Sequence, residues 1–208
     1  MKTRLASVVL VIAALVSAPA LQAQDINVEK KRSRLQQLHD APLKADARRE
    51  FKQFRRKGRF YGAFFANLSE NVAGSYWDAA NIETAEAHAR TSCATKSSEP
   101  EDCILYARVL PKHYDPSESG LTLSRSGNQD FREYTRLQDV ERYGAFAMSD
   151  NGAIGYSWAE HSRASADREA LKRCTKSARK LLRNTPKHLQ GVLASSPQHV
   201  CRVVHRSG

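Results

Sequence analysis

Residues 61–77 of this chain read YGAFFANLSENVAGSYW, and residues 143–158 read YGAFAMSDNGAIGYSW. Each stretch opens on Tyr-Gly-Ala-Phe, reaches a glycine (Gly74 or Gly155) and ends on a tryptophan three residues later. The two differ in length by one residue, in the turn before the glycine. Such self-similarity within one chain indicates that a structural unit is written twice.

The match continues beyond each tryptophan. Alanines stand eleven and fifteen residues after each glycine, and a cysteine stands nineteen residues after it. The six positions are Ala85, Ala89 and Cys93 in the first copy and Ala166, Ala170 and Cys174 in the second. Residues four apart share one face of a helix. Because a glycine inside a strand is typical of a close approach by another element, we expect each helix to pack over the glycine of its own copy.

Each copy predicts the order strand, strand, helix, strand. The quoted stretches are expected to form paired strands, because Asn151-Gly152 is a strong hairpin signal. Asn81 and Ser162 each stand seven residues after the glycine and are good helix N-caps. The second cysteine of each copy opens an apolar run that predicts the last strand. The expected fold class is α+β: a tandem repeat of this unit, each copy stapled by a disulfide, with an N-terminal basic helical segment.

The chain has four cysteines, two in each copy. Four cysteines allow three connectivities, and the repeat selects pairing within each copy, Cys93–Cys103 and Cys174–Cys201. Four reduced thiols and a zinc site are the alternatives. A zinc site is disfavoured because the cysteines lack the short paired spacing that such sites use.

The N-terminal residues 1–23 have the pattern of a secretory signal peptide. They start with two basic residues, continue with an apolar run over residues 5–16 and end in small residues. We expect cleavage after Ala23, with Ala20 as the alternative site. The apolar run is shorter than the roughly 20 residues that a membrane span needs, which argues against an uncleaved anchor. The expected location is exported, either periplasmic or secreted, with no transmembrane segment in the mature chain.

The formal net charge is +11, and most of the excess lies near the N-terminus. Residues 29–59 contain twelve Lys or Arg residues against four acids. Residues 24–58 are interpreted as helical, because Leu43, Ala47, Phe51 and Phe54 recur at helical spacing. The candidate anion-binding residues are Arg48, Arg49, Lys52, Arg55, Arg56, Lys57 and Arg59. The segment is interpreted as a surface helix docked by its apolar stripe, and a helix that binds a membrane surface or a partner is the alternative.

The remaining organisation follows from the two copies. The first copy is assigned to residues 59–110 and the second to residues 142–208. Residues 111–141 are rich in Pro, Ser and Gly at their start and are expected to be a linker with a short helix. Residues 184–200 interrupt the second copy, contain two prolines and a glycine, and are expected to be an inserted loop.

The chain resembles the bacterial "domain of unknown function 4189" family. The resemblance rests on Tyr143-Gly144-Ala145-Phe146-Ala147, on residues 151–157, and on the alanine-rich helix that ends in cysteine. The first copy departs from the pattern at Phe64-Phe65 and at residues 71–73. The resemblance implies the disulfide-stapled fold and an exported protein, and it transfers no catalytic residue.

The polar residues do not form a recognisable catalytic or metal-binding motif. None of the seven histidines has metal-ligand spacing, and no carboxylate pair repeats between the copies. His161-Ser162 could suggest a base and nucleophile, but such partners usually come from different elements. Trp77 and Trp158 are interpreted as core residues, with ligand stacking as the alternative. We expect no cofactor, since the chain has no glycine-rich phosphate loop.

These observations favour a non-catalytic exported binding or interaction protein. Its expected partner is an anionic envelope component or a protein that meets its basic surfaces, and no sequence-specific nucleic-acid binding is expected. A small secreted hydrolase or toxin-like effector that uses carboxylate and histidine residues is the alternative function. A dimer across the glycine-bearing strands is a third, structural possibility.

Overall fold

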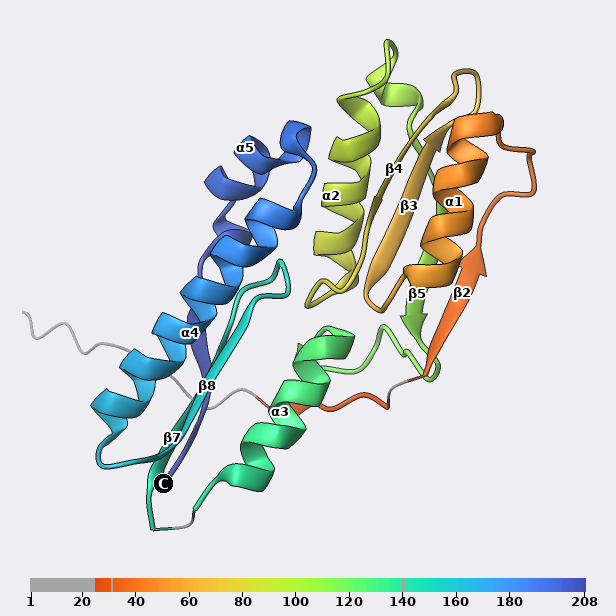
Figure 1. The fold of residues 1–208 in the computed structure, drawn as a ribbon. Coiled ribbons are helices and arrows are strands. Elements are labelled where there is room, and N and C mark those ends of the chain that lie inside the picture. The colour runs from red at the N-terminus through yellow and green to blue at the C-terminus, as the bar shows by residue number, and fades with distance from the viewer. Residues whose placement is uncertain (1–24, 31, 140) are drawn as a thin grey trace, which may run out of the picture.

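The computed structural model describes residues 25–208 except 31 and 140. The predicted signal peptide, residues 1–23, lies outside this range. The fold is mixed α+β, with two main sheets that each have helices on both faces (Figure 1). The first sheet lies between α1 and α2, and the second lies between α3 and α4.

The first sheet has four strands, all paired antiparallel. In spatial order they are β2 (Ser33–Gln37), β5 (Ile104–Pro111), β3 (Gly62–Asn67) and β4 (Val72–Tyr76). Helix α2 (Ile82–Ala94) packs on one face, and α1 (Ala45–Lys57) packs on the other. Every residue of β3 is buried, since this strand is covered on both faces.

The second sheet has the strand order β8 (Ile154–Glu160), β7 (Tyr143–Met148), β9 (Arg202–Ser207). Helix α4 (Arg163–Asn184) packs on one face, and α3 (Arg125–Leu137) packs on the other. In both sheets the strand that carries Gly-Ala-Phe lies between its hairpin partner and the strand after the second cysteine.

Each sheet touches its helix most closely at the central glycine. A Cβ atom added to Gly74 would lie 2.2 Å from the Cys93 nitrogen and 2.5 Å from the Ala89 oxygen. At Gly155 the corresponding distances are 2.1 Å to the Cys174 nitrogen and 2.4 Å to the Ala170 oxygen. Any side chain here would overlap helix backbone, so only glycine allows the two backbones to meet. The expectation that each helix packs over its own glycine is confirmed.

The structure contains the disulfides Cys93–Cys103 and Cys174–Cys201. This is the pairing that the matched spacing predicts. Each bond joins the helix that covers the glycine to the residue directly before β5 or β9. The Cα atoms are 6.1 Å apart in both bonds, within the range normal for disulfides.

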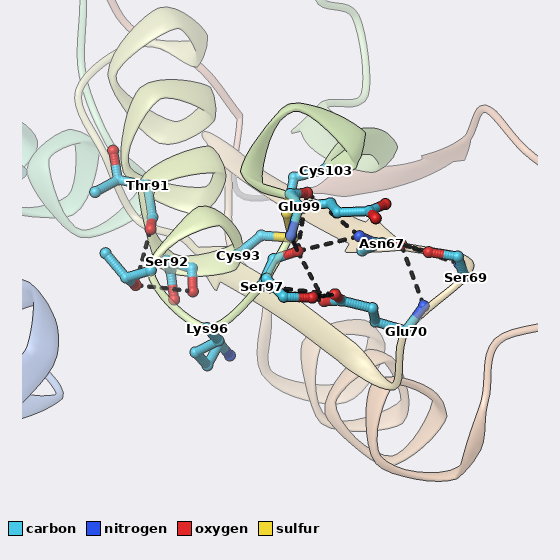
Figure 2. Close-up of a disulfide and its surroundings, with 12 residues drawn as sticks. Asn67, Ser69, Glu70, Thr91, Ser92, Cys93, Lys96, Ser97, Glu99 and Cys103 are labelled. Atoms are coloured by element: carbon cyan, nitrogen blue, oxygen red, sulfur yellow. Dashed lines mark hydrogen bonds between the residues drawn. A yellow bond between two sulfur atoms is a disulfide. The ribbon is translucent and has the colours of Figure 1, made fainter.

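Hydrogen bonds hold the loop between Cys93 and Cys103 (Figure 2). The Glu70 carboxylate accepts hydrogen bonds from the Ser97 hydroxyl at 2.7 Å and the Ser98 backbone at 3.1 Å. The Asn67 amide, at the end of β3, donates to the Ser97 hydroxyl at 3.1 Å. The hydrogen bonds from Ser98 and Ser97 lower the pKa of Glu70. The hairpin turn of the sheet therefore fixes the segment that carries the second cysteine.

The interpretation of residues 24–58 as helical is wrong for its first half. Among the described residues of this segment only Ala45–Lys57 is helical, while Ile26–Asn27 forms β1 and Ser33–Gln37 forms β2. Strand β1 pairs in parallel with β6 (Leu121–Thr122). All five residues of β2 are exposed, so the strand is held by backbone pairing with the edge of β5 rather than by an apolar face.

The expectation of a loop over residues 184–200 is also wrong. Helix α5 spans Lys187–Ser195, and the short 3-10 helix η2 spans Pro197–His199. Leu189 and Leu193, one helical turn apart, are 2% and 1% exposed and belong to the core between α2 and the first sheet. This segment therefore packs against α2 and the first sheet.

The predicted short helix before the second copy is α3. It begins at Arg125, where the Ser124 hydroxyl caps it by accepting a hydrogen bond from the Gly127 backbone at 2.9 Å. Its Phe131 ring stands edge-on to the Phe146 ring of β7, with centroids 5.1 Å apart. The helix packs on the second sheet and is part of that core, as α1 is part of the first.

The β7–β8 turn of the second sheet contacts β4 and α2 of the first. The Asn151 side-chain oxygen lies 2.6 Å from His88 Nε2, and its backbone oxygen accepts a hydrogen bond from the Tyr76 hydroxyl at 3.0 Å. All three residues are buried. Gly152 has a φ of +94°, and a Cβ there would lie 2.2 Å from the Asp78 oxygen. The Asn-Gly pair therefore makes the turn and also contacts the first unit.

Replacing Gly155 with alanine tests the helix–sheet contact. We expect Gly155→Ala to lower the free energy of unfolding by about 1–3 kcal/mol or more, because the helix backbone must move. Gly191→Ala is the matched control, since a Cβ there meets nothing within 4 Å and the residue lies inside α5. The free energy of unfolding of the control should rise by about 0.5–1 kcal/mol, because alanine has a higher helix propensity than glycine. Urea unfolding gives both values, and equal stability of Gly155→Ala and wild type would refute the contact.

The buried His88 predicts a dependence of stability on pH. Burial lowers the pKa of His88 below its ordinary value of 6.5. The unfolded chain then binds more protons than the folded chain near pH 6, so stability is full above about pH 6.5 and falls as pH drops below it. Burial also lowers the pKa values of His188 and His205.

We expect the difference in unfolding free energy between about pH 7.5 and pH 5.5 to be smaller in His88→Gln than in wild type. Urea unfolding at the two pH values measures it. An unchanged difference in the variant would show that His88 does not contribute.

Candidate functional site

Helix α1 presents the predicted basic residues to solvent. Its Ala47, Phe51 and Phe54 side chains are buried, and Phe51 and Phe54 lie with centroids 5.0 and 5.6 Å from the Phe64 ring of β3. The rest of the helix surface is therefore left outside the core. All seven candidate residues are exposed: Arg48, Arg49, Lys52, Arg55, Arg56, Lys57 and Arg59. We call this surface the basic face of α1.

Only part of the charge on this face is neutralised within the protein. Arg49 pairs with Asp46 at 2.5 Å, and Arg48 Nε donates to the Leu43 backbone oxygen at 3.1 Å. The Arg55 guanidinium lies 6.0 Å from the Phe51 ring centroid. Among the residues that the structure describes, no carboxylate lies within 4.0 Å of the other six basic groups, Lys57 included.

The charges at the end of α1 also suit the helix itself. Arg55, Arg56 and Lys57 occupy its last turn, where the helix dipole favours positive charge. This local benefit is a reason, apart from ligand binding, for basic residues at these three positions. It does not apply to Arg48 and Lys52, which stand in the first two turns of the helix.

A second basic surface lies on α4, on the opposite side of the molecule in Figure 1. Glu169 forms ion pairs with Lys172 at 3.4 Å and Arg173 at 2.9 Å, and the Arg173 guanidinium lies 5.0 Å from the Trp158 ring centroid. Four further basic side chains on this helix are exposed: Lys176, Arg179, Lys180 and Arg183. The protein thus carries two separate basic helix surfaces.

A groove of about 700 Å³ runs along the β4 edge beside the basic face of α1. Its walls come from α1, β4, the end of α2 and the α4–α5 connection. The Glu50 carboxylate of α1 bridges two walls of the groove. It accepts a hydrogen bond from Ser75 Oγ of β4 at 3.1 Å and forms an ion pair with Lys96, just after α2, at 3.2 Å. Trp77 lines the groove and is only partly buried, packing on Phe54 at 6.3 Å.

The interpretation of Trp77 and Trp158 as core residues therefore holds only in part. Both are partly buried, and each leaves some surface accessible. The groove itself escaped sequence reasoning, because its residues lie on four elements far apart in the chain. Among the residues singled out from the sequence, Trp77 and Arg49 line it.

The other candidate polar residues have structural partners. The Ser162 hydroxyl accepts from the Ser165 backbone at 3.2 Å and caps α4, and the His161 ring contacts Arg142. Within the described range, no three His, Cys, Asp or Glu side chains gather to hold a metal ion. In the same range, no helix is long and apolar enough to cross a membrane. Comparisons with family models, curated proteins and solved structures found no match for this chain.

Proposed function

We propose that this chain is an exported, non-catalytic binding protein, and that the basic face of α1 binds a phosphate-bearing anionic component of the cell envelope. One observation carries the proposal: seven exposed basic side chains stand on and just after one helix, and most have no carboxylate partner in the described structure. Arg and Lys side chains in this arrangement attract anionic surfaces and polymers over a range set by salt.

The proposed export rests on two features. Residues 1–23 have the signal-peptide pattern, and two disulfides are compatible with an oxidising compartment outside the cytosol. The periplasm and the extracellular medium both fit these features.

We further propose that the two units are copies of one ancestral unit, and that they are divergent members of the family which the sequence resembles. Three shared features support this. Strands β4, β3 and β5 of the first sheet have the same order as β8, β7 and β9 of the second, and the glycine contacts agree. Each glycine is also followed four residues later by a positive φ, 63° at Asp78 and 55° at Ala159. The last feature is uncommon outside glycine, and its recurrence at one position of both units argues for common descent.

Charge replacement tests the proposed surface. In the variant, Arg48, Lys52, Arg55 and Arg56 become glutamine, which leaves the buried stripe of α1 intact. Deleting the helix would be a poorer test, because Phe51 and Phe54 belong to the core. The control variant replaces Lys176, Arg179, Lys180 and Arg183 of α4 with glutamine and so removes the same charge.

Co-sedimentation of the mature protein, beginning at Gln24, with vesicles of anionic phospholipid is the measurement. We expect wild-type binding at low salt that weakens at high salt. The α1 variant should bind roughly a thousandfold more weakly, since each of the four lost Lys or Arg charges contributes about 1 kcal/mol near such a surface. The α4 variant should keep most of its binding. Equal losses in the two variants would show that total charge, and not the face of α1, determines binding.

A further inference from the structure

A second cavity, of about 240 Å³, lies near the start of α2. The β1–β6 pair, the first turn of α2 and the loop over residues 114–120 surround it. Four carboxylates line it: Glu29, Glu83, Asp115 and Glu118. Two tyrosines line it as well, Tyr61 and Tyr114, with ring centroids 5.7 Å apart in an edge-on arrangement.

The cavity is acidic although the protein is strongly basic. Among the described residues, no lysine, arginine or histidine lines it, and none of its four carboxylates has an ion-pair partner within 4.0 Å. Burial and the Glu118 charge raise the pKa of Glu29, and His113, which lines the adjoining pocket with Lys30, lowers it. Hydrogen bonds from Ser117 lower the pKa of Asp115, which keeps that group ionised. The start of α2 offsets part of the Glu83 charge and leaves the cavity negative.

One residue of the cavity wall has a buried hydroxyl without a hydrogen-bond partner. Tyr61 is 1% exposed, and its hydroxyl makes no hydrogen bond in the described structure. Burial and then the Glu29 charge raise the pKa of Tyr61, the Thr122 side chain lowers it, and the Glu83 charge raises it. A buried polar group without a partner is costly, and such a group in a cavity wall points to a ligand that would satisfy it.

The second unit shows what the corresponding tyrosine contacts. Tyr143 opens the second Tyr-Gly-Ala-Phe stretch, and the guanidinium of Arg163 lies 5.8 Å from its ring centroid. Arg163 is the first residue of α4, directly after the Ser162 cap. Ile82 holds the same place in α2, directly after the Asn81 cap, and it lines the cavity. The first unit thus lacks the cation that the second unit supplies from its own chain.

We propose that this cavity binds a small organic cation, a primary ammonium group on a short aliphatic chain. The carboxylates would accept hydrogen bonds from the ammonium group, and the Tyr61 hydroxyl would gain a hydrogen-bond partner. The tyrosine rings and Ile82 would contact the aliphatic part of the ligand. The volume suits a ligand smaller than most cofactors. An organic cation fits better than a metal ion, because the described carboxylates are not gathered closely enough to coordinate one. The inference is independent of the function proposed for α1.

Isothermal titration of the mature protein with 1,5-diaminopentane and with Nα-acetyl-lysine amide tests the proposal. We expect saturable binding of one equivalent of at least one of these probes. Binding of the diamine alone would indicate a free amine as the natural ligand, and binding of both would indicate a lysine side chain; either result supports the ammonium site. Absence of heat with both probes would overturn it.

Three variants locate the binding. Glu83→Gln and Glu118→Gln should each weaken it about tenfold, the effect of losing one charge-assisted hydrogen bond. Glu101→Gln, an exposed glutamate outside the cavity, is the control and should bind like wild type. Unchanged affinity in both cavity variants, with melting temperatures like that of wild type, would overturn the site. Stoichiometric displacement of the amine by Ca²⁺ would also overturn it, in favour of a metal site.

Discussion

At Gly74 and Gly155 the backbone of a helix lies directly against the backbone of a strand, and much of the remaining structure depends on that contact. The helix can approach so closely only because the residues facing the sheet are alanines and a cysteine, which are buried and small. The approach places the helix cysteine within bonding distance of the cysteine that precedes β5 or β9. Each disulfide therefore fixes a geometry that the glycine has already permitted.

The same arrangement determines which surfaces of the protein carry exposed charged residues. One face of each sheet is taken by the alanine-rich helix, so the opposite face needs another apolar cover, and α1 and α3 supply it with aromatic side chains. Because Phe51 and Phe54 are buried in the core, the basic residues on the other faces of α1 are exposed to solvent. The acidic cavity arises at the far end of the first unit, where β1 and the loop before β6 close over Tyr61. Opposite charges are thus kept on separate surfaces of one small protein.

The sequence predicted those features that follow from local spacing. The strand pairs, the caps at Asn81 and Ser162, the helices over the glycines and the disulfide pairing all follow from the repeated pattern, and the structure contains them. Strand β2 could not be predicted, because its residues are exposed and it depends on the free edge of β5. Helix α5 was not predicted, because Gly191 and the flanking Pro186 and Pro197 are typical of a loop. Two buried leucines, Leu189 and Leu193, hold it against the core.

The two cavities were beyond prediction for another reason. Glu29, Glu83 and Glu118 come together only after three distant segments have folded, and none of them belongs to the repeated pattern. The basic face of α1 was predicted residue by residue, because helical periodicity alone separates its apolar stripe from its charges. Its ligand was predicted only as a class, since charge identifies no particular anion.

Peptide mapping without reduction tests most directly the claim that each unit is stapled on its own. Trypsin cuts after Lys96 and after Lys187, so each half-cystine falls on a separate peptide. The account predicts two linked pairs, residues 91–96 with 97–108 and residues 174–176 with 188–202. A peptide that links Cys93 or Cys103 to Cys174 or Cys201 would contradict it, because the helix of one unit would then be tied to the sheet of the other.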